Sequence, residues 1–113
     1  MSPVEIINRT PHPVVILERG GPHNLEEVVE RFAPRDPPIR LESHLRYANN
    51  PGDWPTRMFG GADRDTPEIE GTYYIVSLVT ALAVRRGDFL VPDEEVRDSD
   101  GRIIGCRRLA RVA

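Results

Sequence analysis

Three side chains of this sequence could together perform nucleophilic catalysis. Ser77 could act as the nucleophile, His12 as the base that takes its proton, and Asp88 or Asp98 as the group that orients the histidine. The residues at 75–79 read Ile-Val-Ser-Leu-Val and lack the glycines of a nucleophile elbow. A serine before an apolar helical stretch also caps a helix, and we favour that role for Ser77. A small hydrolase or transferase using His12 with Ser77 or Asp88 is therefore the alternative function.

Polar residues without an evident local role form a second candidate site, which would bind a ligand. We assign six residues to it: Thr10, His12, Arg85, Asp88, Arg97 and Asp98. The prolines beside His12 leave it little freedom to lose on binding, and arginine forks recognise carboxylates and phosphates. The sequence therefore predicts that His12, Arg85 and Arg97 converge on a small anionic, nucleotide-like ligand. The alternative is that these residues are structural. His12 or Thr10 would then tie the corner to nearby backbone, and surface ion pairs would join Arg85 to Asp88 and Arg97 to Asp98.

Neither a metal site nor a cofactor site is expected. A metal site needs several ligands at short spacing, but the candidates are scattered along the chain: His12, His23, His44 and Cys106. The run Asp98–Gly101 resembles part of a calcium loop, yet that register would put Val96 and Arg107 at ligand positions. It is better explained as a hairpin turn. Neither a Walker loop nor a dinucleotide-binding fingerprint is present.

Composition limits the class of protein. At 113 residues the chain is long enough for a single domain with one modest core. The net charge of −3 argues against broad nucleic-acid binding, and all 15 basic residues are arginine. Cys106 is the one cysteine, so an intrachain disulfide is impossible. The start of the chain does not resemble a signal peptide, and the longest apolar stretch, Tyr73–Val84, is too short to span a bilayer. We therefore expect a soluble cytoplasmic protein without a membrane partner.

The first half of the chain predicts strands around a proline-rich corner. Val4–Asn8 and Val14–Leu17 have the β-branched residues of strands, and the corner Thr10–Pro13 joins them. Residues 24–32 are ambiguous, since Asn24 could cap a helix whereas Val28-Val29 suits a strand; a short helix is slightly favoured. Ile39–Glu42 alternates like a strand.

A long irregular loop is expected from about 47 to 67, with a brief strand at Thr56–Phe59. Trp54 is the one tryptophan, and we expect it to anchor this loop to the core.

The last third is the most regular part of the sequence. Thr72–Val76 predicts a strand, and Ser77 then caps a helix over Leu78–Arg86 that ends at Gly87. Apolar residues of this helix, Leu78, Leu82 and Val79, are expected to face the core.

Two further strands follow the helix. Phe89–Val91 predicts a strand that ends at Pro92 or lies at an edge. Asp98–Gly101 predicts a type I′ hairpin turn, and Arg102–Leu109 the last strand. Together these elements predict a small α+β domain, 1–113, with a mostly antiparallel sheet curling toward a barrel and one short helix at about 78–86.

Five motifs of the chain resemble those of a group of small bacteriophage and actinobacterial proteins. They are Asn-x-Thr-Pro-His-x-Val at 8–14, Gly-Thr-x-Tyr-Ile-Val-Ser at 71–77, Arg-x-Asp at 86–88, Val-Pro at 91–92 and Val-Arg-Asp-x-x-Gly-Arg-Ile-Ile-Gly-Cys at 96–106. The resemblance implies a phage or mobile-element origin but no activity. It also implies a proline-containing strand-turn-strand across residues 32–41, which weakens the case for a helix at 24–32.

These observations predict a non-enzymatic accessory or binding module for a small anionic ligand or a protein partner. A homo-oligomer is a further expectation if the final strand, within Arg102–Val112, lies at a sheet edge and pairs across a two-fold axis.

Overall fold

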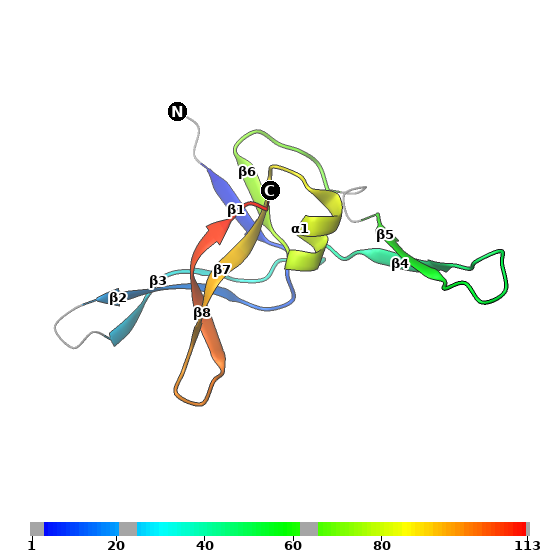
Figure 1. The fold of residues 1–113 in the computed structure, drawn as a ribbon. Coiled ribbons are helices and arrows are strands. Elements are labelled where there is room, and N and C mark those ends of the chain that lie inside the picture. Colours follow the sequence, from blue (N-terminus) through cyan, green and yellow to red (C-terminus); the bar gives the residue numbers. More distant parts are fainter. Residues whose placement is uncertain (1–3, 21–24, 62–65, 113) are drawn as a thin grey trace.

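The computed structural model describes residues 4–20, 25–61 and 66–112 of the chain. Within these ranges the chain forms eight strands and one helix (Figure 1). In chain order they are β1 (Glu5–Asn8), β2 (Val14–Gly20), β3 (Leu25–Phe32), β4 (Glu42–Arg46), β5 (Thr56–Gly60), β6 (Thr72–Ile75), α1 (Leu78–Val84), β7 (Phe89–Arg97) and β8 (Ile103–Ala110).

Six strands form one sheet in the order β1-β6-β7-β8-β2-β3, and its two ends nearly meet. The chain that leaves β3 forms a bridge from Pro34 to Asn8 of β1, and the Arg35 N–H donates to the Asn8 carbonyl at 2.8 Å. The two longest ladders, β2–β3 and β7–β8, are antiparallel. The shorter ladders of this sheet, β1–β6, β6–β7 and β2–β8, are parallel. The predicted small α+β fold, with a barrel-like sheet and one short helix, is confirmed.

The core lies on both faces of β6. On one face Tyr74 packs with Phe89, and their rings meet edge-to-face with centroids 6.4 Å apart. On the other face Ile75 packs with Val14 and Cys106. A short strand buried on both faces has a continuous apolar sequence, which explains why this segment was easy to identify as a strand.

Helix α1 begins as predicted but presents the opposite face to the core. Ser77 is its N-cap, and its Oγ accepts a hydrogen bond from the Thr80 N–H at 3.3 Å. The helix ends at Arg85, which adopts a left-handed conformation (φ 41°), and not at Gly87. The prediction that its leucines and Val79 face inward is wrong. Thr80 and Ala81 are buried, because these small residues let the helix lie close to the sheet, while Leu78, Val79 and Leu82 are exposed.

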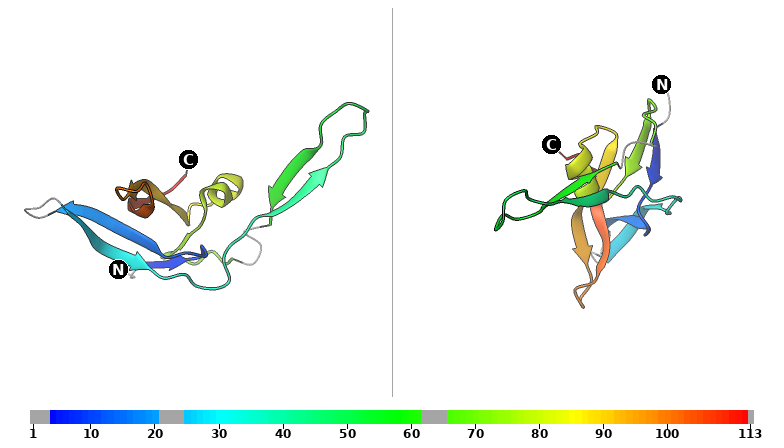
Figure 2. Two further views of the ribbon diagram at one scale, coloured as in Figure 1. Left: turned by 90° about the horizontal axis from the view of Figure 1, so that it is seen from below. Right: turned by 90° about the vertical axis from the view of Figure 1, so that its right-hand side faces the viewer.

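The segment expected to be a long loop, 47–67, contains the connection and the second strand of an antiparallel hairpin, β4–β5, whose first strand lies just before it. The hairpin projects away from the barrel as an arm (Figure 2), and the molecule measures 65 × 41 × 25 Å. The expected strand at Thr56–Phe59 is confirmed as β5, whereas the strand expected at Ile39–Glu42 is displaced and begins at Glu42. Trp54 does not anchor this segment, because 88 % of its surface is exposed near the tip of the arm.

Residues 25–32 form strand β3, so the preference for a short helix was wrong. Val28 and Val29 are both exposed, and β3 is stabilised by its ladder with β2 and not by an apolar helical face. The expected cap Asn24 lies outside the described residues.

The last strand, β8, lies between β7 and β2, so it has no free edge for pairing with a second copy. The hairpin before it is confirmed, but a type I′ turn is wrong. Gly101 alone among the turn residues has a positive φ, +82°, whereas a type I′ turn needs two. Pro92 does not end β7 but lies within it, beyond the last residues of β7 that pair with β6. Among the described residues, none of the helices has the length and apolar character needed to cross a bilayer.

Candidate functional site

The six predicted binding residues lie in three separate places. Thr10 and His12 lie at the corner between β1 and β2, Arg85 and Asp88 lie between α1 and β7, and Arg97 and Asp98 lie at the far end of β7. Strand β7 has nine residues, so roughly 25 Å of strand separates its two ends. Arg85 and Arg97 therefore cannot meet at one small ligand, and the predicted convergence with His12 is wrong.

The corner before β2 is fixed by a buried asparagine that the sequence did not single out. Asn8 is 1 % exposed, and its Nδ2 donates to the carbonyls of His12 and Phe32 at 2.8 and 2.9 Å. Its Oδ1 accepts from the N–H and the hydroxyl of Thr10 at 2.9 and 2.7 Å. Thr10 therefore ties the corner to neighbouring groups, as the structural alternative for this residue predicted.

His12 and Ser77 line one pocket of about 350 Å³, together with Thr10, Pro92 and Glu95. The Ser77 hydroxyl donates to Thr80 Oγ1 at 2.8 Å, so both its donor and its acceptor serve the helix cap. Within the described part of the chain, the His12 ring has no hydrogen bond to Ser77 or Asp88. The pocket thus brings a histidine and a serine to one place without the base–nucleophile contact that nucleophilic catalysis requires.

Asp88 is engaged by Arg86, not by Arg85 as predicted. Arg86 donates to both carboxylate oxygens of Asp88 and to the Thr66 carbonyl, and its guanidinium lies 4.6 Å from the centre of the Phe89 ring. Only 10 % of the Arg86 side chain is exposed. This ion pair is part of the packing between the helix and β7.

Arg97 and Asp98 build the β7–β8 turn, and within the described part of the chain they do not pair with each other. Arg97 donates to the Gly101 carbonyl at 2.7 Å and lies 3.2 Å from Glu95. Asp98 Oδ1 accepts from the N–H groups of Asp100 and Arg102. Both side chains therefore have structural roles in the turn.

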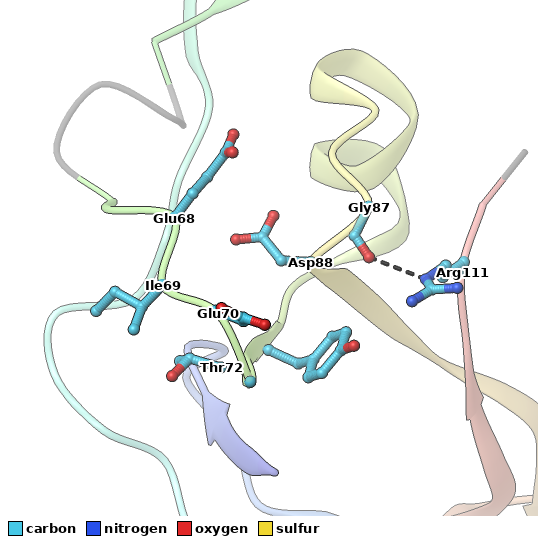
Figure 3. Close-up of a pocket in the computed structure, with 9 residues that line it drawn as sticks. Glu68, Ile69, Glu70, Thr72, Gly87, Asp88 and Arg111 are labelled. Atoms are coloured by element: carbon cyan, nitrogen blue, oxygen red, sulfur yellow. Dashed lines mark hydrogen bonds between the residues drawn. The ribbon is translucent and has the colours of Figure 1, made fainter. Parts of the chain in front are cut away.

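A pocket of about 510 Å³ lies between β6 and the start of β7 (Figure 3). Three carboxylates surround it, from Glu68, Glu70 and Asp88. Its one arginine, Arg111, donates Nε to the Gly87 carbonyl at 2.9 Å. Arg86 offsets the charge of Asp88 and lies 3.7 Å from Glu68, so the pocket has no surplus of positive charge with which to hold an anionic ligand.

A groove of about 360 Å³ lies between the start of α1, the corner at Pro11 and the base of the arm. Its lining residues are mostly apolar: Thr10, Pro11, Pro38, Ile39, Arg40, Leu41, Phe59, Ser77, Val79 and Thr80. Arg40 is the one charged residue in this lining. Next to the groove, a pocket of about 290 Å³ shares the segment Pro38–Leu41 and is also lined by Arg9 and Glu42.

The outer face of α1 continues the apolar surface of this groove. The exposed fractions of Leu78, Val79 and Leu82 are 57, 55 and 43 %, and Phe59 at the base of the arm is 53 % exposed. A helix normally buries its apolar side, so an uncovered one is an unusual feature. The helical spacing of Leu78, Val79 and Leu82 identified one apolar side of the helix. The spacing alone does not show whether that side packs against the core or forms a binding surface.

Cys106 is buried, at 2 % exposure, and its thiol lies 3.7 Å from the Val15 carbonyl oxygen. Burial raises the pKa of the Cys106 thiol, which makes it a poor nucleophile. Among the described residues no group of three or more His, Cys, Asp or Glu side chains could hold a metal ion.

No protein-family model, curated protein or solved structure matches this chain. The resemblance to small bacteriophage and actinobacterial proteins therefore remains a prediction from the motifs.

Proposed function

We propose that this protein is a non-enzymatic binding module that holds a short segment of a partner protein. The segment would place an apolar side chain in the groove between α1 and the arm, and a carboxylate next to Arg40. The observation that carries the proposal is the groove itself, which joins an apolar lining to the uncovered face of a helix.

The apolar part of the groove favours a protein segment over a nucleotide. Phe59 of β5, Val79 of α1 and Ile39 of the segment before β4 line it. Leu78 and Leu82 of the same helix are also exposed. Recognition of an apolar segment in a groove of this kind gains most of its free energy from burying such side chains. Exposed aliphatic residues on one helix face are otherwise a cost to solubility.

Arg40 supports a partner with a carboxylate. Its side chain is exposed, and it lines both the apolar groove and the neighbouring pocket that contains Arg9. A planar guanidinium at the end of an apolar groove suits an Asp, a Glu or a chain terminus next to an apolar residue. Glu42 shares the neighbouring pocket and would disfavour a second negative charge there.

The other functions have less support. A nucleotide-like ligand would need several positive groups at one place, and the pocket beside β6 is rimmed by carboxylates instead. A larger pocket, of about 630 Å³, contains Arg19 and Arg107, but Glu26 lies 3.9 and 2.6 Å from their guanidinium groups and offsets their charge. A hydrolase using His12 and Ser77 would need the serine to give up its cap to Thr80. A phage or mobile-element origin remains compatible with an accessory module of this size.

The proposal can be tested by selecting random peptides on the immobilised protein. We expect enriched peptides to contain an apolar residue next to Asp or Glu, and fluorescence polarisation with a selected peptide to report its affinity. Val79→Glu and Arg40→Glu should each weaken binding at least about tenfold, since each changes one half of the recognition.

Val28→Glu is the matched control, because Val28 is equally exposed but lies on β3, away from the groove. It should leave the affinity unchanged. Selection that enriches no peptide, or peptides that bind the groove variants as tightly as the unchanged protein, would contradict the proposed function.

A further inference from the structure

The β4–β5 arm has two open edges. Its ladder runs from Glu42 opposite Gly60 to Arg46 opposite Thr56, and neither strand pairs with any other described strand. All five residues of β4 are exposed. An isolated two-stranded hairpin is marginally stable in water, and an open edge offers unpaired N–H and C=O groups to another strand. The arm is therefore an element that gains stability by adding a strand.

The sequence of β4 is complementary to itself. It reads Glu42-Ser43-His44-Leu45-Arg46, and a two-fold axis through His44 would align two copies of the strand antiparallel. Each Glu42 would then lie opposite Arg46 of the second copy, and each Ser43 opposite Leu45. We infer that two copies of this protein associate by pairing their β4 edges, which turns two arms into one four-stranded antiparallel sheet.

The apolar residues of the arm fit the same arrangement. Cross-strand partners share a face, so Leu45 lies on the face that carries Phe59, which is opposite Ser43. Tyr47 follows two residues after Leu45 and is 75 % exposed. One further step of the register at each end brings Tyr47 opposite Leu41 of the second copy. Pairing would thus cover apolar surface on one face and match charges on the other.

The β5 edge does not offer this complementarity. Its residues Thr56–Gly60 include one charged side chain, Arg57, and no acid. An antiparallel pair of β5 strands centred on Met58 would leave both arginines without a partner. Arg46 likewise has no ion-pair partner among the described residues within its own chain, where it lies opposite Thr56. The charge pattern therefore selects β4 as the pairing edge.

Sedimentation velocity over a dilution series tests this association directly. A five-residue strand pair buries a small area, so we expect a weak dimer that forms as the concentration rises toward about 100 µM. Arg46→Glu would bring Glu42 opposite a glutamate at two symmetric positions, and Glu42→Arg would do the same with arginines. Each variant should raise the dimer dissociation constant about tenfold or more, because opposed like charges destabilise strand pairs.

The double variant E42R/R46E restores opposite charges across the axis and should dimerise like the unchanged protein. Arg31→Glu makes the same change of charge on β3 and should have no effect. A protein that stays monomeric at every concentration would overturn the inference, and so would single variants that dimerise normally or a double variant that does not recover. Glu42 lines the pocket next to the groove, whereas Arg46 lines neither the groove nor that pocket. Arg46→Glu therefore tests the association without touching the proposed peptide site, and its failure leaves the peptide-binding test unaffected.

Discussion

The guanidinium of Arg86 holds the carboxylate of Asp88 by two hydrogen bonds, Nε to Oδ1 at 2.9 Å and Nη2 to Oδ2 at 2.7 Å. Their side chains are only 10 and 16 % exposed. The same guanidinium covers the Phe89 ring and donates to the Thr66 carbonyl. Arg86 thus fixes the segment between α1 and β7 to the core. The Arg-Gly-Asp sequence at 86–88 therefore has a structural role.

We expect Arg86→Ala to lower the free energy of unfolding by about 3 kcal/mol, because Asp88 would keep its largely buried charge without a partner. Urea unfolding followed by circular dichroism measures this loss. Arg97→Ala is the control, since Arg97 and Glu95 are both more than half exposed and their ion pair should contribute less than about 1 kcal/mol. If both variants lost the same unfolding free energy, burial would not make the Arg86–Asp88 ion pair more stabilising than an exposed one.

Asn8 is the second position where one side chain serves several elements. Asn8→Ala would remove the amide donor that serves the His12 and Phe32 carbonyls, of which the His12 carbonyl still accepts from the Thr10 hydroxyl at 3.0 Å. We expect a loss of about 2 kcal/mol in unfolding free energy. Asn8→Asp should be at least as destabilising near neutral pH, because a carboxylate would face the same two carbonyl oxygens. Partial recovery of the Asp variant in mild acid would follow from protonation of that carboxylate. A fully stable Asp variant at neutral pH would contradict this account.

Stability should also depend on pH through Glu26. Two hydrogen bonds from Arg107, at 2.6 and 2.7 Å, lower the pKa of Glu26, and the charge of Arg107 adds to the effect. A lowered folded-state pKa means that the contribution is complete above the ordinary glutamate pKa of about 4.3 and is lost as the pH falls through the lower value. We expect the unfolding free energy to decline over that acidic range.

Glu26→Gln removes the titrating group while keeping the shape of the side chain. The variant should be less stable at pH 7 and should show a flatter decline in acid. Thermal unfolding at a series of pH values measures both effects. If the variant and the unchanged protein lost stability in parallel as the pH falls, Glu26 would be ruled out as the cause of the acid-dependent loss.

Much of the fold could be predicted from local sequence, and the parts that could not share a physical cause. β6 and the Ser77 cap were predictable because apolar continuity and capping depend on neighbouring residues. Which face of α1 packs against the sheet was not predictable, because helical spacing identifies an apolar side but not the element that covers it. Thr80 and Ala81 face the sheet because the helix approaches it closely, which only the tertiary structure determines.

The arm and the site were missed for related reasons. The pairing of Ser43 with Phe59 joins residues separated by a polar, proline-containing stretch, which reads as a loop. Arg40 and Phe59 line one groove although each stands in a segment without a recognisable motif. The predicted site residues were chosen because local structure did not explain them, and Arg97 and Asp98 proved to have turn roles that involve their near neighbours.

Gly105 allows a close contact between β8 and β2. A Cβ atom at this position would lie 2.7 Å from the Val15 carbonyl oxygen and 2.8 Å from Leu17 Cδ1. Gly105→Ala should therefore push the two strands apart and cost about 2 kcal/mol of unfolding free energy. Gly87→Ala is the control, since a Cβ there meets nothing within 4 Å. Its effect should be within about 0.5 kcal/mol.

The neighbouring cysteine reports whether the strands have separated. Cys106 pairs with Ile16 of β2 and is buried, so its thiol should react slowly with a thiol reagent in the folded protein. In Gly105→Ala the same thiol should react faster under native conditions, while Gly87→Ala should react at the unchanged rate. Because this readout is local, it distinguishes a widened β2–β8 contact from a general loss of stability. An unchanged thiol rate in a destabilised Gly105→Ala protein would mean that the added methyl group is accommodated elsewhere.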